Sequence, residues 1–107
     1  MKEFLRKQLI KFDERLHDLE SLLSSPDIMA DQTAYRKLSK EHAEVTPAAG
    51  RYQRYLQREA DLEAARDMSS DPDMAEMAVE EIESAQVELA ALEEELQRLL
   101  LPKDEDD

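Results

Sequence analysis

The chain has 107 residues, of which 41% are apolar and 38% are charged, with one glycine and no cysteine. This length suits one small domain, and the abundance of Ala, Leu, Glu and Arg is typical of long helices or coiled coils. The lack of cysteine excludes disulfides and thiolate metal sites. The sequence contains neither a run of about 18 apolar residues for a membrane span nor the apolar segment of a secretory signal. We therefore expect an all-α, cytoplasmic protein.

The charge is unevenly distributed along the chain. The net charge is −13, yet residues 1–70 hold 12 basic and 13 acidic side chains. Residues 71–107 hold 2 basic and 14 acidic side chains, so nearly all of the excess lies in the last third. The phosphates of a nucleic acid would be repelled by such a segment. Any contact with RNA must therefore use another face.

The first apolar series predicts an amphipathic helix over residues 2–24. Its members follow one another in steps of four and three residues, which is a heptad seam on one helix face. They are Leu5, Leu9, Phe12, Leu16, Leu19 and Leu23. Ser25 and Pro26 then end the helix, because proline lacks an N–H and restricts the residue before it.

A second series predicts a long helix over residues 31–69, with Asp31 as its N-cap. The series is regular at first and less regular after residue 56. Its members are Tyr35, Leu38, His42, Val45, Ala49, Tyr52, Leu56, Leu62, Ala65 and Met68. Pro47 either kinks this helix or ends it, with a restart capped by Thr46. The side-chain phase continues across Pro47, which favours one long kinked helix.

The third series is the most regular and predicts a helix over residues 72–101. It is preceded by Asp71 as a cap and by Pro72 at the first helical position, and it ends at Pro102. Its members are Ala75, Ala78, Ile82, Ala85, Leu89, Leu92, Leu96 and Leu99. Because the connections between the helices are short, we expect an antiparallel, coiled-coil-like three-helix bundle.

No constellation of side chains predicts catalysis. His17 falls beside the first seam and is expected at the surface, whereas His42 falls on the second seam and is expected to be partly buried. The paired glutamates and terminal aspartates are expected to be solvated charge runs, and a single glycine cannot form a phosphate-binding loop. We therefore expect no enzymatic activity, no cofactor and no metal site.

One row of cations is a candidate binding feature. Arg51, Arg54 and Arg58 are spaced i, i+3 and i+7, so they share a helix face. Two interpretations are open. The arginines either pair with the surplus acids of the third helix, or they contact RNA or a protein partner.

Three segments carry a resemblance to a known family. They are LLSSPDIMADQTAYRKLSKEHAE (residues 22–44), SSDPDMAEMA (residues 69–78) and, most specifically, LLLPKDEDD (residues 99–107). In this order they resemble the N-terminal helical domain of the bacterial peptide chain release factor 1 family and its junction with the next domain. The family of release factor 2 has a different sequence at this junction.

The resemblance implies a role in translation termination. Members of the family recognise stop codons on the ribosome and promote hydrolysis of peptidyl-tRNA, using a codon-reading loop and a Gly-Gly-Gln loop that lie beyond this domain. Residues 1–101 would be the helical N-terminal domain and residues 102–107 an acidic interdomain linker. The expected partners are the ribosome, near the base of its stalk, and the recycling GTPase release factor 3.

A second function class remains open. The same helical pattern suits a stand-alone acidic adaptor, or an oligomeric coiled coil, that binds a basic protein. The second and third helices are longer than the first, so we also expect exposed seam to favour self-association of the chain.

Overall fold

A computed structural model describes residues 1–100, and in this range the fold is all-α. The element order is α1 (Glu3–Leu23), the short 3-10 helix η1 (Pro26–Ala30), α2 (Gln32–Met68) and α3 (Ala75–Leu100). The predictions of an all-α fold and of three long helices are confirmed. The predicted helix end at Pro102 and the predicted linker of residues 102–107 lie outside the described residues.

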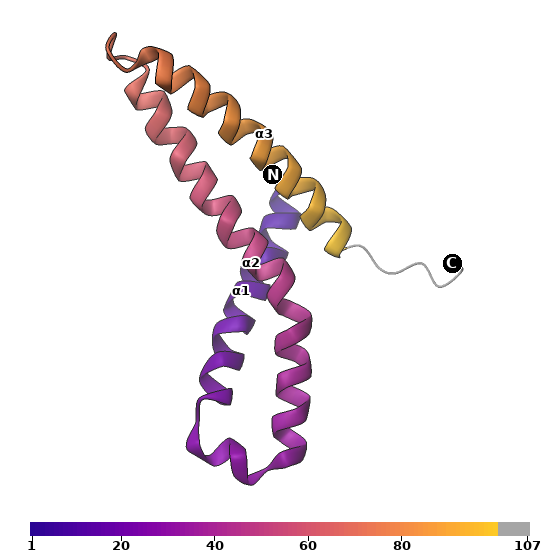
Figure 1. Ribbon diagram of the computed structural model, residues 1–107. Coiled ribbons are helices and arrows are strands. Elements are labelled where there is room, and N and C mark those ends of the chain that lie inside the picture. Colours follow the sequence, from indigo (N-terminus) through magenta and orange to yellow (C-terminus); the bar gives the residue numbers. More distant parts are fainter. Residues whose placement is uncertain (101–107) are drawn as a thin grey trace, which may run out of the picture. The chain divides into compact units, whose positions relative to one another are not determined.

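The chain divides into two compact units, residues 1–50 and the residues from Arg51 onward. The first unit holds α1, η1 and the first part of α2. The second holds the rest of α2 together with α3. Within each unit the two helices run antiparallel, as Figure 1 shows by the colour gradient along the chain.

The core of the first unit is a cluster of buried seam side chains, namely Leu16, Leu19, Val45 and Ala49. Phe12 and Leu38 pack against it. Burial of each large aliphatic side chain contributes about 1.5–3 kcal/mol. At the edge of this seam Arg15 donates two hydrogen bonds to the carboxylate of Glu41, at 2.5 and 2.8 Å. The heptad spacing therefore places its residues as the sequence predicts.

The turn between α1 and α2 is built by short polar side chains. The hydroxyl of Ser24 donates to the carbonyl of Glu20 at 2.7 Å, and Pro26 begins η1, where its missing N–H is not needed. The carboxylate of Asp31 accepts a hydrogen bond from the N–H of Ala34 at 3.1 Å. Asp31 is therefore the N-cap of α2, as predicted.

Helix α2 continues without a break through Pro47. The hydroxyl of Thr46 donates to the carbonyl of His42 at 2.6 Å, which is the hydrogen bond that a threonine inside a helix makes rather than one made at a cap. Of the two alternatives, a stop with Thr46 as N-cap is therefore wrong. The continuous helix is confirmed, and the kink stays a prediction.

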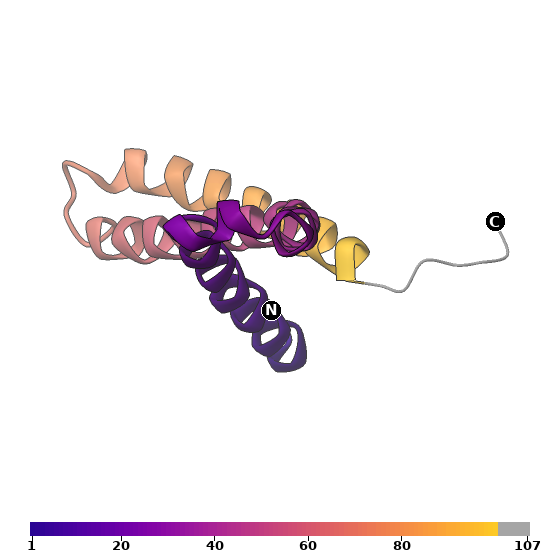
Figure 2. The same cartoon turned by 90° about the horizontal axis from the view of Figure 1, so that it is seen from below.

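The second unit is a helical hairpin made of the latter part of α2 and of α3, and Figures 1 and 2 both show the two helices side by side. Near the tip the buried contacts are made by small residues, Ala65, Ala78 and Ala85. Farther along α3, Leu92 and Leu96 are buried. Small side chains let the two backbones approach closely near the tip, and the leucines supply bulk farther along.

The hairpin departs from the sequence prediction at the start of α3. The helix begins at Ala75 and not at residue 72. The side chain of Asp71 accepts a hydrogen bond from the N–H of Asp73 at 3.0 Å, and its carbonyl accepts one from the N–H of Met74 at 3.0 Å. These bonds hold residues 71–74 in a turn, so Asp71 and Pro72 precede the helix by one turn.

The seam also departs from the prediction in the middle of α2. Tyr55 is 5% exposed and Leu56 is 40% exposed, whereas Leu56 was the predicted member of the seam. Leu56 lies six residues before Leu62, a spacing that no heptad contains. Tyr55 lies seven residues before Leu62, which keeps both on one face.

Candidate functional site

The predicted arginine row lies on the part of α2 that belongs to the second unit, and it faces α3. The two helices run antiparallel, so successive arginines along α2 meet glutamates that come successively earlier in α3. The glutamates that they meet are Glu95, Glu88 and Glu81, which are seven residues apart. This spacing puts the three carboxylates on one stripe of α3.

Two of the arginines are half-exposed. The Nε atom of Arg51 donates to a carboxylate oxygen of Glu95 at 2.7 Å. Arg54 donates from Nε and Nη2 to the two oxygens of Glu88, at 2.5 and 3.0 Å. The side chain of Arg54 is nevertheless 51% exposed. Each of these guanidinium groups therefore pairs with a carboxylate of α3 and stays half-exposed.

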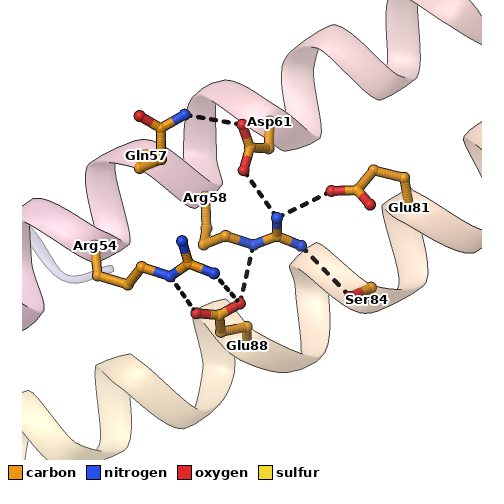
Figure 3. Close-up of polar contacts among 7 residues, drawn as sticks. All are labelled: Arg54, Gln57, Arg58, Asp61, Glu81, Ser84 and Glu88. Atoms are coloured by element: carbon orange, nitrogen blue, oxygen red, sulfur yellow. Dashed lines mark hydrogen bonds and ion pairs between the residues drawn. The ribbon is translucent and has the colours of Figure 1, made fainter.

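Arg58 is different because it is only 8% exposed. It extends from α2 toward α3, as Figure 3 shows, and Nη1 donates to Asp61 at 2.8 Å and to Glu81 at 3.0 Å. Its Nη2 lies 3.5 Å from the hydroxyl of Ser84. Its Nε lies 3.1 Å from Glu88 but, within the described part of the chain, has no hydrogen-bond partner in good geometry. A charge this deeply buried is tolerated because carboxylates surround it.

Two carboxylates of this network, Glu88 and Asp61, have pKa values lowered by their neighbours. The hydrogen bond from Arg54 lowers the pKa of Glu88 below its ordinary value, and the positive charges of Arg54 and Arg58 act in the same direction. The amide of Gln57 is the largest cause that lowers the pKa of Asp61, followed by the hydrogen bond from Arg58. A carboxyl group that acts as a general acid needs a pKa raised toward neutrality. These groups therefore suit ion pairing and not proton transfer.

Comparison with known proteins shows the family to which this chain belongs. A family model described as the PCRF domain matches residues 12–107. The chain belongs to the PCRF domain family.

Several relatives are similar to this chain over all of its 107 residues. Peptide chain release factor 1 of Acidovorax sp. (strain JS42) is 65% identical, and the matched region is 29% of that protein. The protein of the same name from Verminephrobacter eiseniae is 64% identical, with 30% of its length matched, and that from Methylibium petroleiphilum is 53% identical. No solved structure gives a significant match. The resemblance to bacterial release factor 1 is therefore confirmed, and the chain spans about 30% of the length of these relatives.

The PCRF domain brings all three predicted arginines into one row, each paired with acids. The structure thus bears out the first interpretation, in which the arginines pair with acids of the third helix. The second interpretation, contact with RNA or a protein partner, stays a prediction. Sequence reasoning did not single out Asp61, Glu81 and Glu88. The heptad spacing of residues 81, 88 and 95 was the signal that could have found the glutamates.

The two histidines lie as expected. His17 is exposed, and its Nδ1 lies 2.8 Å from the carbonyl of Asp13, a hydrogen bond that raises the pKa of His17 together with the charge of the Asp13 side chain. His42 is half-buried. Within residues 1–100, no group of three or more His, Asp or Glu side chains could hold a metal ion. No helix in that range is long and apolar enough to cross a membrane.

Proposed function

We propose that this chain is a non-catalytic binding and positioning module of a cytoplasmic translation termination factor. The observation that carries the proposal is the match over the whole chain, 65% identical, to proteins named peptide chain release factor 1. Residues 1–101 are its helical domain and residues 102–107 a linker to the next domain. The stop-codon reading and peptidyl-tRNA hydrolysis of the whole factor belong to other domains.

The proposed partners are the ribosome, at the base of its stalk, and the recycling GTPase release factor 3. Arg51 and Arg54 supply the contact, because the guanidinium of each is half-exposed beside its ion pair with Glu95 or Glu88. Arg58 positions Arg54 indirectly, since the carboxylate of Glu88 lies against both Arg54 and Arg58. The stand-alone acidic adaptor is the less favoured alternative, because the chain matches release factor 1 along its entire length.

The test is a chimera in which this chain replaces the matching residues of the Acidovorax release factor 1. We expect the chimera to release peptide in a stop-codon-dependent way and to respond to release factor 3. Changing Arg51→Gln and Arg54→Gln together should weaken the response to release factor 3 and to the stalk, and leave codon-dependent release within about twofold, because two exposed charges contribute little to folding.

The matched control is Lys37→Gln with Lys40→Gln, which removes two exposed positive charges from the other part of α2. An equal loss in both variants would mean that only net charge matters. An unchanged response in the arginine variant would reduce Arg51 and Arg54 to structural pairs. A chimera that releases no peptide at all would contradict the proposed function itself.

A further inference from the structure

The outer face of α3 carries acidic residues that pair with no cation of residues 1–100. Glu81, Glu88 and Glu95 are matched by the arginines of α2. Three others, Glu80, Glu83 and Glu94, are exposed and make no hydrogen bond or ion pair with any residue in the described range 1–100. Within the described residues, the acids of α3 that face α2 are therefore paired, whereas Glu80, Glu83 and Glu94 on its outer side are not.

An apolar centre lies between these unpaired glutamates. Val87, in the middle of the helix, is 71% exposed. Ala90 and Ala91 beside it are also exposed. A shallow depression follows the same face and is lined by Glu80, Glu83, Ser84, Val87, Glu88 and Ala91.

The spacing of this face is that of a helix-packing seam. Residues 80, 84, 87, 91 and 94 follow in steps of four, three, four and three, so α3 carries a second heptad stripe besides the one that packs on α2. Ser84 and Ala91 are small and allow a neighbouring helix to come close, with Val87 as the central projecting side chain. Glu80 and Glu94 stand at the two ends, about 21 Å apart at 1.5 Å per residue.

We propose that this outer stripe of α3 is a docking surface for a helix of a basic partner protein. The helix would place Lys or Arg against Glu80 and Glu94, with a small apolar stripe between them against Val87 and Ala91. A second copy of the chain fits poorly, because it would bring the same unpaired glutamates together. Nucleic acid fits poorly as well, because phosphates would face these carboxylates. This inference does not depend on the arginine row of α2.

A synthetic peptide helix of about 21 residues tests the proposal, with two lysines 14 positions apart and alanine and leucine on the stripe between them. We expect its titration into the whole chain at low salt to shift the backbone amide resonances of residues 80–94. The same peptide with glutamate in place of both lysines should give no shifts.

Matched variants separate this surface from a general attraction to an acidic protein. Changing Glu80→Gln and Glu94→Gln together should weaken binding about three- to tenfold, from the loss of two exposed charge pairs. Changing Glu14→Gln and Glu20→Gln on α1 alters the net charge equally and should leave affinity within about twofold. Val87→Ser should weaken binding, whereas Met29→Ser, at another exposed apolar position, should not.

Circular dichroism should show that each variant stays helical, as expected for changes at exposed positions. Equal weakening by the α1 and α3 double variants would overturn the proposal. So would resonance shifts confined to residues outside 80–94. A single-stranded RNA probe that shifts residues 80–94 more strongly than the lysine peptide would likewise overturn it.

Discussion

At the scale of single residues, Arg51, Arg54 and Arg58 show that a shared helix face does not mean a shared role. Arg51 and Arg54 are exposed enough to meet a partner, whereas Arg58 is held among carboxylates from both helices of the hairpin. Its aliphatic stem also fills space that a shorter side chain would leave empty. The burial of each guanidinium, and not its place in the row, decides its function.

Arg58→Ala should therefore destabilise the chain clearly more than Arg54→Ala. The change leaves Asp61, Glu81 and Glu88 close together without their central cation. Breaking a fully buried ion pair costs about 3–5 kcal/mol. Here the carboxylates are partly exposed, so we expect about 1–3 kcal/mol for Arg58→Ala. Urea unfolding followed by circular dichroism measures both variants, and equal midpoints would show that burial of Arg58 has no energetic consequence.

At the scale of elements, apolar periodicity predicted each helix because the heptad seams are the surfaces that pack. The predicted first and second helices differ from α1 and α2 by one residue at each end. The sequence prediction started α3 three residues too early. An aspartate can accept hydrogen bonds from nearby N–H groups either as a helix N-cap or within a turn, and helix-start rules do not separate the two. Tyr55 is buried in place of Leu56 because Tyr55, seven residues before Leu62, lies on the same helix face as Leu62. Asp61 lies on α2 three residues after Arg58. The heptad spacing of Glu81 and Glu88 marks a common stripe of α3, but their match with Arg58 also needed the antiparallel alignment of α2 and α3.

The ion pairs between α2 and α3 should make the hairpin sensitive to acid. Arg54 holds the pKa of Glu88 below its ordinary value of 4.5. A carboxylate whose pKa is lower in the folded state stabilises fully above its unfolded pKa, and this contribution is lost as the pH falls through the folded value. The stabilising effect of Glu88 should thus be complete at pH 7 and should disappear as the pH falls below 4.5.

Comparison with Glu88→Gln isolates this effect. We expect the native chain to have the higher melting temperature at pH 7, and the difference between the two to shrink steadily below pH 4.5. Glu80→Gln removes a charge from α3 without removing an ion pair, so it controls for the change in net charge. A difference between the native chain and Glu88→Gln that is the same at pH 7 and pH 3 would contradict the role assigned to this pair.

At the scale of the whole molecule, two tendencies oppose each other. Exposed apolar side chains such as Leu56 and Leu99 favour association of copies, whereas a net charge of −13 keeps identical copies apart. A basic partner experiences only attraction from that charge. Salt weakens both electrostatic effects, so it should act in opposite directions on self-association and on partner binding.

Sedimentation at rising salt concentration tests self-association directly. We expect a monomer at an ionic strength of about 0.01 M, where repulsion extends over about 30 Å, and an increasing fraction of dimer toward about 1 M, where it extends over about 3 Å. Leu56→Ser with Leu99→Ser should reduce the dimer fraction, because both side chains are exposed members of the predicted seams. Binding of the lysine peptide should weaken over the same range.

Two outcomes would contradict this expectation for self-association. A chain that stays monomeric throughout would show that its seams are satisfied within one molecule. A dimer that dissociates as salt rises would mean that ion pairs and not apolar contacts join the copies.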